Sequence, residues 1–257
     1  MNKSLIKSKL LIAGAIISMF LTSCATKHDV VYFQNAKSFE TIVDTDTFKA
    51  KLKVGDIVSI YISTLDETVT KPYNLVKSTG GQGLLVDYLI DVDGNIDYPV
   101  LGKIKLLGLT VEQAKALFKK KFDEGQLLKD PVVIFRVLNF RVTVAGEVRD
   151  PGVYPVSGER ISILEALGMA GDLTIKGRRD NILVVRDFNG TKTYTRIDLT
   201  NKEVFNSPVY YLTQNDYVYV EPNNSAISLA SGDSRVNTII TITSFLLTTA
   251  LIFVTRN

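Results

Sequence analysis

Residues 52–62 read LKVGDIVSIYI, a glycine-containing turn that leads directly into a strand pattern. Val58, Ile60 and Ile62 are every second residue of that pattern, so they fall on one face of an extended chain. A period of two with one apolar face is typical of a strand that packs against a small core. We expect this strand to open a β-rich domain over residues 48–138.

Two further segments follow the strand, a polar one and then a strand with a turn signal. Residues 64–87 are mostly polar and rich in glycine, which predicts a loop or a mobile insertion. Residues 88–102 contain an Asp-Gly pair that predicts the turn of a hairpin. Asp91 and Asp93 also suggest a calcium loop, but the remaining ligand positions of an EF-hand are absent, so the hairpin turn is favoured.

The first domain is predicted to close with a helix and a strand. Thr110 and Gln113 have the spacing of a capping box, in which each residue's side chain accepts a hydrogen bond from the other's backbone amide at the start of a helix. Residues 131–137 are apolar and β-branched, which predicts a returning strand.

A second β-rich domain is predicted over residues 139–222. Ser162 and Glu165 form another capping box, and the helix that they begin ends near residues 168–171, where glycine can adopt the left-handed conformation. Further strands are expected at residues 142–148, 182–186, 191–197 and 216–220. Two small β-rich domains with packed helices define an α+β fold, and residues 223–235 predict a polar hinge after them.

The chain ends in an uncharged stretch of 20 residues, VNTIITITSFLLTTALIFVT, over residues 236–255. A helix of this length spans roughly 30 Å, the thickness of the hydrocarbon core of a bilayer, so we expect a transmembrane helix. Eight of the 20 residues are Asn, Ser or Thr. Five of them fall within about 60° of one another around a helix: Asn237, Thr241, Ser244, Thr248 and Thr255.

Three interpretations of this striped helix remain open. Copies of it can close around an aqueous lumen, with the polar stripe lining a pore. It can also be a single membrane anchor whose Thr hydroxyls bond back to carbonyls of their own helix. A buried core helix is the third reading.

The N-terminus has the parts of a secretory signal. A basic segment with three lysines precedes an apolar stretch at residues 10–21, which is too short to span a bilayer comfortably. Leu21-Thr22-Ser23-Cys24 then resembles the lipobox of bacterial lipoproteins. We therefore expect residues 1–23 to be removed as a signal peptide, Cys24 to carry a lipid, and residues 24–47 to form a tether.

Composition argues against several classes of function. Removal of residues 1–23 takes away three lysines and leaves 27 basic against 27 acidic residues, so no nucleic-acid partner is expected. Cys24 is the only cysteine and His28 the only histidine, which argues against disulfides, a metal site and a Ser–His pair. Four carboxylates near one another in sequence occupy turn and cap positions without a nucleophile, so we expect no catalytic residue, no cofactor and no enzyme: Glu147, Asp150, Glu159 and Glu165.

Taken together, these stretches resemble the outer-membrane polysaccharide export lipoproteins over residues 48–222. Lys53-Val54-Gly55-Asp56 is similar to the family's opening motif, with Val where Pro is usual. Asp91–Ile96, Pro99–Gly102 and Gly108–Thr110 resemble the polysaccharide export domain, and Gly146–Tyr154 with Glu165–Gly171 resemble the soluble-ligand-binding β-grasp (SLBB) domain.

The resemblance implies an outer-membrane lipoprotein with periplasmic domains that forms a homo-oligomeric ring, an octamer in the best-known members. Its C-terminal helices would build a channel, with the polar stripe facing the lumen, that exports capsular polysaccharide or exopolysaccharide. An inner-membrane polysaccharide co-polymerase, often coupled to a tyrosine autokinase, is the implied partner. The chain has room for one SLBB domain where longer members have two. The alternative is a membrane-tethered lipoprotein that binds a glycan or a partner, with the last helix a simple anchor.

Overall fold

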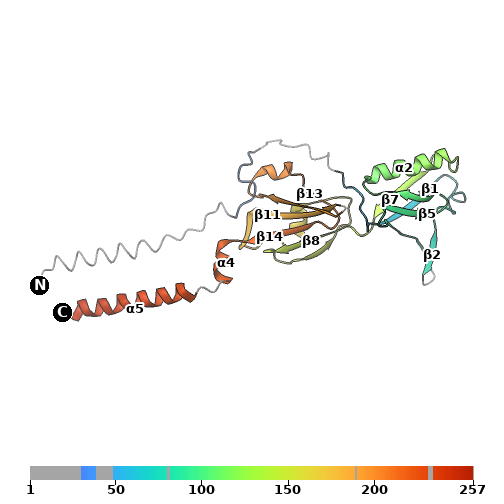
Figure 1. The fold of residues 1–257 in the computed structure, drawn as a ribbon. Helices are drawn as coiled ribbons and strands as arrows, with labels where there is room; N and C mark the ends of the chain where they lie inside the picture. Colours follow the sequence, from blue (N-terminus) through green and yellow to red (C-terminus); the bar gives the residue numbers. More distant parts are fainter. Residues whose placement is uncertain (1–29, 39–48, 80–81, 189, 231–233, 257) are drawn as a thin grey trace.

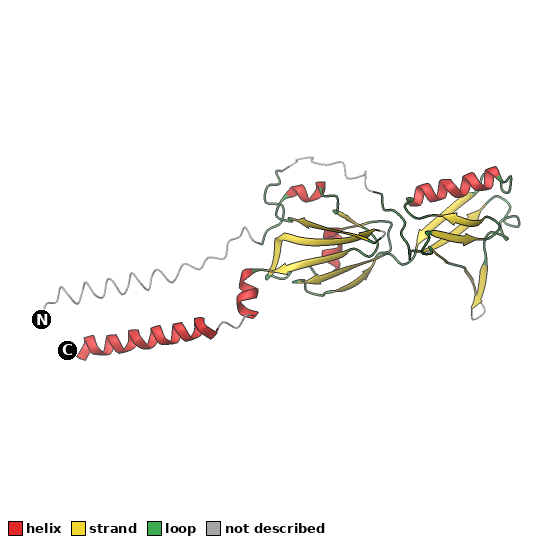
Figure 2. Ribbon diagram, viewed as in Figure 1, coloured by secondary structure: helices red, strands yellow, loops and turns green. Residues whose placement is uncertain are grey.

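The computed structural model describes residues 30–38, 49–79, 82–188, 190–230 and 234–256. They form two β-rich domains and a long terminal helix that points away from the second domain (Figure 1). The second domain lies between the first domain and this helix (Figure 2). The α+β class with two β-rich domains is confirmed.

The first domain is built on the strand predicted from residues 52–62. β1 (Ile57–Ser63) is the central strand of a three-stranded antiparallel sheet, between β4 (Tyr88–Leu89) and β7 (Val132–Val137). Its three inward side chains are at most 1% exposed. The alternation seen in the sequence therefore marks the face of β1 that is buried in the core.

Helix α2 (Val111–Glu124) packs against β7. The predicted capping box begins it: the Thr110 hydroxyl accepts a hydrogen bond from the Gln113 amide, and the Gln113 side chain accepts one from the Thr110 amide. Phe118 and Phe122 are fully buried, and each packs edge-on against a tyrosine ring of the same domain. The helix thus contributes the large side chains of the first core.

The stretch predicted as a loop contains a hairpin. Within residues 64–87, β2 (Val76–Thr79) pairs antiparallel with β3 (Gln82–Leu85). The hairpin projects from the body of the domain (Figure 1). Its strands have little buried apolar area, which is why the hydrophobic pattern did not predict them.

The Asp-Gly pair forms a turn, as predicted, but not the turn of a hairpin. It connects β4 to the next strand, and that strand forms a hairpin with the strand after it. The Asp91 carboxylate accepts a hydrogen bond from the Asn95 amide at 2.7 Å, and Gly94 has a φ of +79°, so residues 91–95 form a tight turn between β4 and the next strand. The hairpin pairs β5 (Asn95–Tyr98) with β6 (Gly102–Lys105). Asp91 is thus engaged as a turn residue.

The second domain is a five-stranded sheet in the order β12-β11-β14-β8-β9. Only β14 and β8 run parallel; the other neighbours are antiparallel. The strands are β8 (Arg141–Gly146), β9 (Gly152–Pro155), β11 (Gly177–Phe188), β12 (Thr191–Ile197) and β14 (Tyr217–Pro222).

One face of this sheet carries the second core. Helix α3 (Ile163–Met169) begins with the predicted capping box of Ser162 and Glu165 and buries its apolar side chains in that core. The 3₁₀ helix η2 (Lys202–Asn206) adds a buried valine, and the short strands β10 (Ile161–Ser162) and β13 (Tyr211–Leu212) pair with each other.

Gly146 allows the parallel strands β8 and β14 to approach closely. Its φ is +90°, a conformation that residues with a side chain rarely adopt. A Cβ atom placed on Gly146 would lie 2.1 Å from the carbonyl oxygen of Val220 on β14. A glycine is therefore required where β8 ends.

Two helices end the chain. α4 (Asn224–Ala230) occupies part of the predicted hinge and packs against β14. α5 (Ser234–Arg256) lies where the terminal helix was expected. Its assignment as a transmembrane helix is not supported, because no helix among the described residues is long and apolar enough to cross a membrane. The eight Asn, Ser and Thr residues of the stretch lower its hydropathy.

Candidate functional site at the domain junction

Lys53, the first residue of the motif Lys53-Val54-Gly55-Asp56 described above, connects the two domains. Its side chain is 9% exposed, and its Nζ donates to Thr213 Oγ1 and to the Gln214 carbonyl oxygen, both at 2.9 Å. Burial lowers the pKa of the Lys53 ammonium, and the nearby Asp216 carboxylate opposes that shift. A lysine of the first domain is thus held by a turn of the second.

Asp216 and Arg186 support the receiving turn from within the second domain. Asp216 is fully buried and pairs with Arg186 Nη2 at 2.7 Å. It also accepts hydrogen bonds from the Thr213 amide at 2.8 Å and the Thr213 hydroxyl at 2.9 Å. The Thr213 hydroxyl therefore accepts from Lys53 and donates to Asp216, so one chain of polar contacts crosses the junction.

Asn139, between the two domains, is bonded on both sides. Its Oδ1 accepts from the Ile57 amide and its Nδ2 donates to the Gly55 carbonyl, each at 2.9 Å. On the other side, the Asn139 carbonyl accepts from Gln214 Nε2 at 2.6 Å, and Gln214 Oε1 accepts from the Arg141 amide at 2.7 Å. We call this set the domain junction: residues 53–57, Asn139 and residues 213–216, with Arg186.

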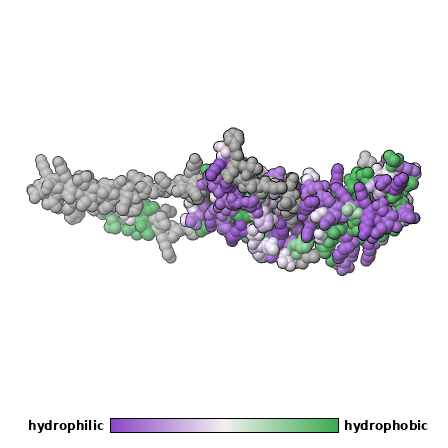
Figure 3. Space-filling view, turned by 90° about the horizontal axis from the view of Figure 1, so that it is seen from above, coloured by the Kyte–Doolittle hydropathy of each residue, from purple (hydrophilic) through white to green (hydrophobic). Residues whose placement is uncertain are grey.

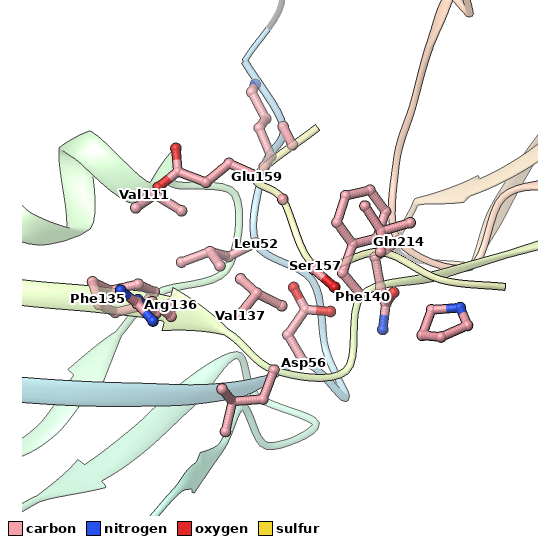
Figure 4. Close-up of a pocket in the computed structure, with 16 residues that line it drawn as sticks. Leu52, Asp56, Val111, Phe135, Arg136, Val137, Phe140, Ser157, Glu159 and Gln214 are labelled. Carbon is pink, nitrogen blue, oxygen red and sulfur yellow. The ribbon is translucent and has the colours of Figure 1, made fainter. Parts of the chain in front are cut away.

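A cleft of about 570 Å³ opens beside the junction (Figure 4). Much of its wall is apolar, with Leu52, Val137 and Phe140 among the lining residues, and Ser157 and Glu159 line it from the second domain. This volume is within the range of small-molecule pockets.

Asp56 is one of the residues that line this cleft, and it is 3% exposed. Its Oδ2 accepts from the Lys53 amide at 2.8 Å, whereas its Oδ1 has no hydrogen-bond partner among the described residues. Burial raises the pKa of Asp56 to about 6. The motif residue Asp56 therefore shapes the turn that presents Lys53, and it carries a desolvated carboxylate oxygen.

Two of the four carboxylates considered in the sequence, those of Glu165 and Glu147, have structural partners within the second domain. Glu165 caps α3, and Glu147 accepts a hydrogen bond from the Thr174 hydroxyl at 2.8 Å. Glu159 lines the cleft. At Asp150 the main-chain carbonyl, and not the carboxylate, accepts a hydrogen bond from the Tyr154 hydroxyl. Among the residues that the structure describes, no group of His, Cys, Asp and Glu could hold a metal ion.

The N-terminal segment docks on the second domain, which the sequence did not reveal. The Phe33 and Gln34 amides donate to the Leu199 and Thr200 carbonyls, at 3.1 and 2.7 Å, and Phe33 stacks on the ring of Phe205. The Tyr32 hydroxyl donates a hydrogen bond to Asp172. Burial is the largest cause of the raised pKa of Tyr32, and this hydrogen bond raises it further. Cys24 lies outside the described residues.

The predicted stripe is described in part. Ser244 and Thr248 donate to the carbonyls of Ile240 and Ser244, both at 2.7 Å. Thr243 and Thr249, which are not among the five stripe residues, make the same kind of bond to their own helix. Thr241 is exposed. The side chains of Asn237 and Thr255 lie outside the described residues.

Fold and site together define a two-domain protein whose domains are joined by a buried polar junction and whose terminal helix is exposed. Residues 45–138 match the family model of the polysaccharide biosynthesis/export protein, and residues 141–196 match that of the SLBB domain. Together the two matches cover more than half of the chain. The chain belongs to the polysaccharide biosynthesis/export protein family.

Two curated relatives are similar to the chain, and each is an EPS I polysaccharide export outer membrane protein, EpsA. The protein of Ralstonia solanacearum is 27% identical over 207 residues, which is 74% of this chain and 54% of the relative. The protein of Ralstonia nicotianae is 31% identical over 156 residues, 56% of this chain and 40% of the relative. The chain thus spans about half the length of the relatives that it matches.

Proposed function

We propose that this protein takes part, as a homo-oligomer and without enzymatic activity, in the export of an exopolysaccharide or capsular polysaccharide across the outer membrane. The observation that carries the proposal is the order of the two matched domains in one chain. A lipid on Cys24 would hold the protein at the outer membrane, in line with the names of the relatives.

The exposed apolar surface of α5 supports self-association. Figure 3 shows green, apolar residues at the surface of the terminal helix. Six large side chains of the helix are between 54% and 67% exposed in the single chain: Ile239, Ile240, Ile242, Phe245, Leu246 and Ile252. A monomeric soluble protein rarely leaves such a contiguous surface uncovered. We propose that α5 helices of several copies bury it against one another.

The polar stripe suggests which side of α5 would face the centre of such an assembly. With the apolar side chains packed between copies, we propose that Asn237, Thr241, Ser244, Thr248 and Thr255 face a shared aqueous lumen. Ser244 and Thr248 use their protons inside the helix, but each hydroxyl oxygen keeps a lone pair for water or a sugar hydroxyl. A neutral, hydrated surface suits a sugar chain that must pass without binding tightly.

The test is the amount of polysaccharide that cells release. A strain without the gene should retain its polysaccharide, and the wild-type gene should restore release. Thr241→Leu with Thr248→Leu should restore release poorly, whereas Thr243→Leu, a matched change off the stripe, should restore it fully. Normal release from the strain without the gene would refute the proposal.

The second candidate is a membrane-tethered lipoprotein that binds a glycan or a partner, with α5 as a simple anchor. One observation favours it. Four hydroxyls of α5 already bond to carbonyls of the helix, so they do not require a lumen. In that case both leucine variants should behave like the wild type.

The orientation of the molecule suggests where an inner-membrane partner would bind. The first domain lies at the opposite end of the described chain from α5 (Figure 1). We propose that this end meets a polysaccharide co-polymerase, with or without its tyrosine kinase. Crosslinks to such a partner should come from the first domain and not from α4.

A further inference from the structure

The face of the five-stranded sheet opposite the second core carries a row of tyrosines. Val184, Val218 and Val144 on neighbouring strands are fully buried and point into the core. The residues that alternate with them therefore point to the other face. On β12 and β14 these are Tyr194, 68% exposed, and Tyr217, 38% exposed.

Register places these side chains in a line across the sheet. Tyr194 pairs with Val185, Val185 with Tyr217, Tyr217 with Thr143, and Thr143 with Val153. We call these five residues the tyrosine row. Because neighbouring strands are about 4.8 Å apart, Tyr194 and Tyr217 stand roughly 10 Å apart, and Tyr217 and Val153 the same.

Tyr219 widens the row along β14. Its ring is stacked with that of Tyr217 at 6.5 Å between centroids and 9° between planes. The next position on β8 is Ala145, paired with Tyr219, so small side chains lie beside both rings. The result is an aromatic surface with two nearly parallel rings, bordered by the Arg196–Glu221 ion pair.

The chemistry of the row favours a hydrated ligand over a second protein subunit. Within the row, Val153 is the only exposed aliphatic side chain, whereas a stable protein–protein interface buries about 800 Å² per partner and has a mostly apolar centre. Tyrosine combines an apolar ring with a hydroxyl that both donates and accepts.

We propose that the tyrosine row, together with Tyr219, binds a polysaccharide chain. The C–H faces of sugar rings would pack on Tyr194 and Tyr217, whose separation of roughly 10 Å matches about one disaccharide of an extended chain. The phenol hydroxyls would meet the sugar hydroxyls. The choice of a polysaccharide as ligand rests on the proposed function, and the site is on the second domain, separate from the α5 stripe.

Affinity electrophoresis of the full-length protein in detergent tests this site. The gel contains the exopolysaccharide isolated from the producing strain, and the retardation measures the dissociation constant. Tyr194→Ser with Tyr217→Ser should weaken binding by about tenfold or more, the effect of losing one or two stacking contacts. Tyr194→Phe keeps the ring and should bind within about threefold of the wild type.

Tyr61→Ser is the matched control, because Tyr61 is a partly exposed tyrosine on β1 of the first domain. It should bind like the wild type. Equal retardation of the wild type and the double serine variant, or no retardation of the wild type, would overturn the proposal. Dissociation of the oligomer by the double variant, with binding per chain unchanged, would assign the row to a subunit interface instead. Release of polysaccharide by the strain without the gene tests the proposed function separately.

Discussion

Lys53→Met should loosen the domain junction. The change keeps an unbranched side chain of similar length but removes both hydrogen bonds from Nζ, to Thr213 Oγ1 and the Gln214 carbonyl. Hydrogen bonds from a charged donor contribute about 1.5–3 kcal/mol each. Methionine also avoids the cost of burying an ammonium, so we expect a net loss of about 3 kcal/mol in the free energy that opposes opening of the junction.

Hydrogen exchange of the full-length protein measures that opening. The amides of Ile57 and Arg141 donate to Asn139 and Gln214 within the junction, so both report on it. A loss of about 3 kcal/mol should speed their exchange roughly 100-fold. Lys51→Met, which changes an exposed lysine two residues earlier, should leave both rates unchanged. Unchanged exchange in Lys53→Met would refute the reasoning that this lysine holds the domains together.

Three further changes test other parts of the structure. Asp56 has a pKa of about 6 in the folded protein and about 4 when unfolded, so its contribution to stability is greatest below pH 4 and is lost as the pH rises through 6. The free energy of unfolding in urea should therefore decline between pH 4 and pH 7. Asp56→Asn should remove up to roughly 3 kcal/mol of this decline. Gly146→Ala should destabilise the protein by about 3 kcal/mol in the same assay, because the alanine Cβ would lie 2.1 Å from the Val220 carbonyl oxygen. Gly158→Ala is the control and should be tolerated, because the nearest atom to its Cβ would be 3.4 Å away. Phe33→Ala should speed exchange of the Gln34 amide about tenfold by removing the stack on Phe205; an unchanged rate would mean that the stack does not hold this segment.

Features encoded by neighbouring residues could be predicted from the sequence. Both capping boxes depend on residues three positions apart, and both are present. The alternation in β1 likewise needs only a few adjacent residues to specify its buried face. The hairpin of β2 and β3 was missed, although Gly80-Gly81 between two short runs is a known hairpin signal.

The domain junction could not be predicted, because its partners are far apart in the chain. Lys53 and Thr213 are 160 residues apart, and neither residue type indicates the other. The motif containing Lys53 was recognised from its resemblance to a family, but the resemblance gave no role for the lysine. The docking of Phe33 on Phe205 is equally non-local.

The copy number of the full-length lipidated protein in mild detergent, measured by native mass spectrometry, tests the proposed assembly most directly. Self-association through α5 predicts one closed oligomer of several copies, which falls apart when Phe245 and Leu246, 67% and 61% exposed in the single chain, are replaced by Asn. A monomer under conditions in which both domains remain folded would contradict the proposed export oligomer.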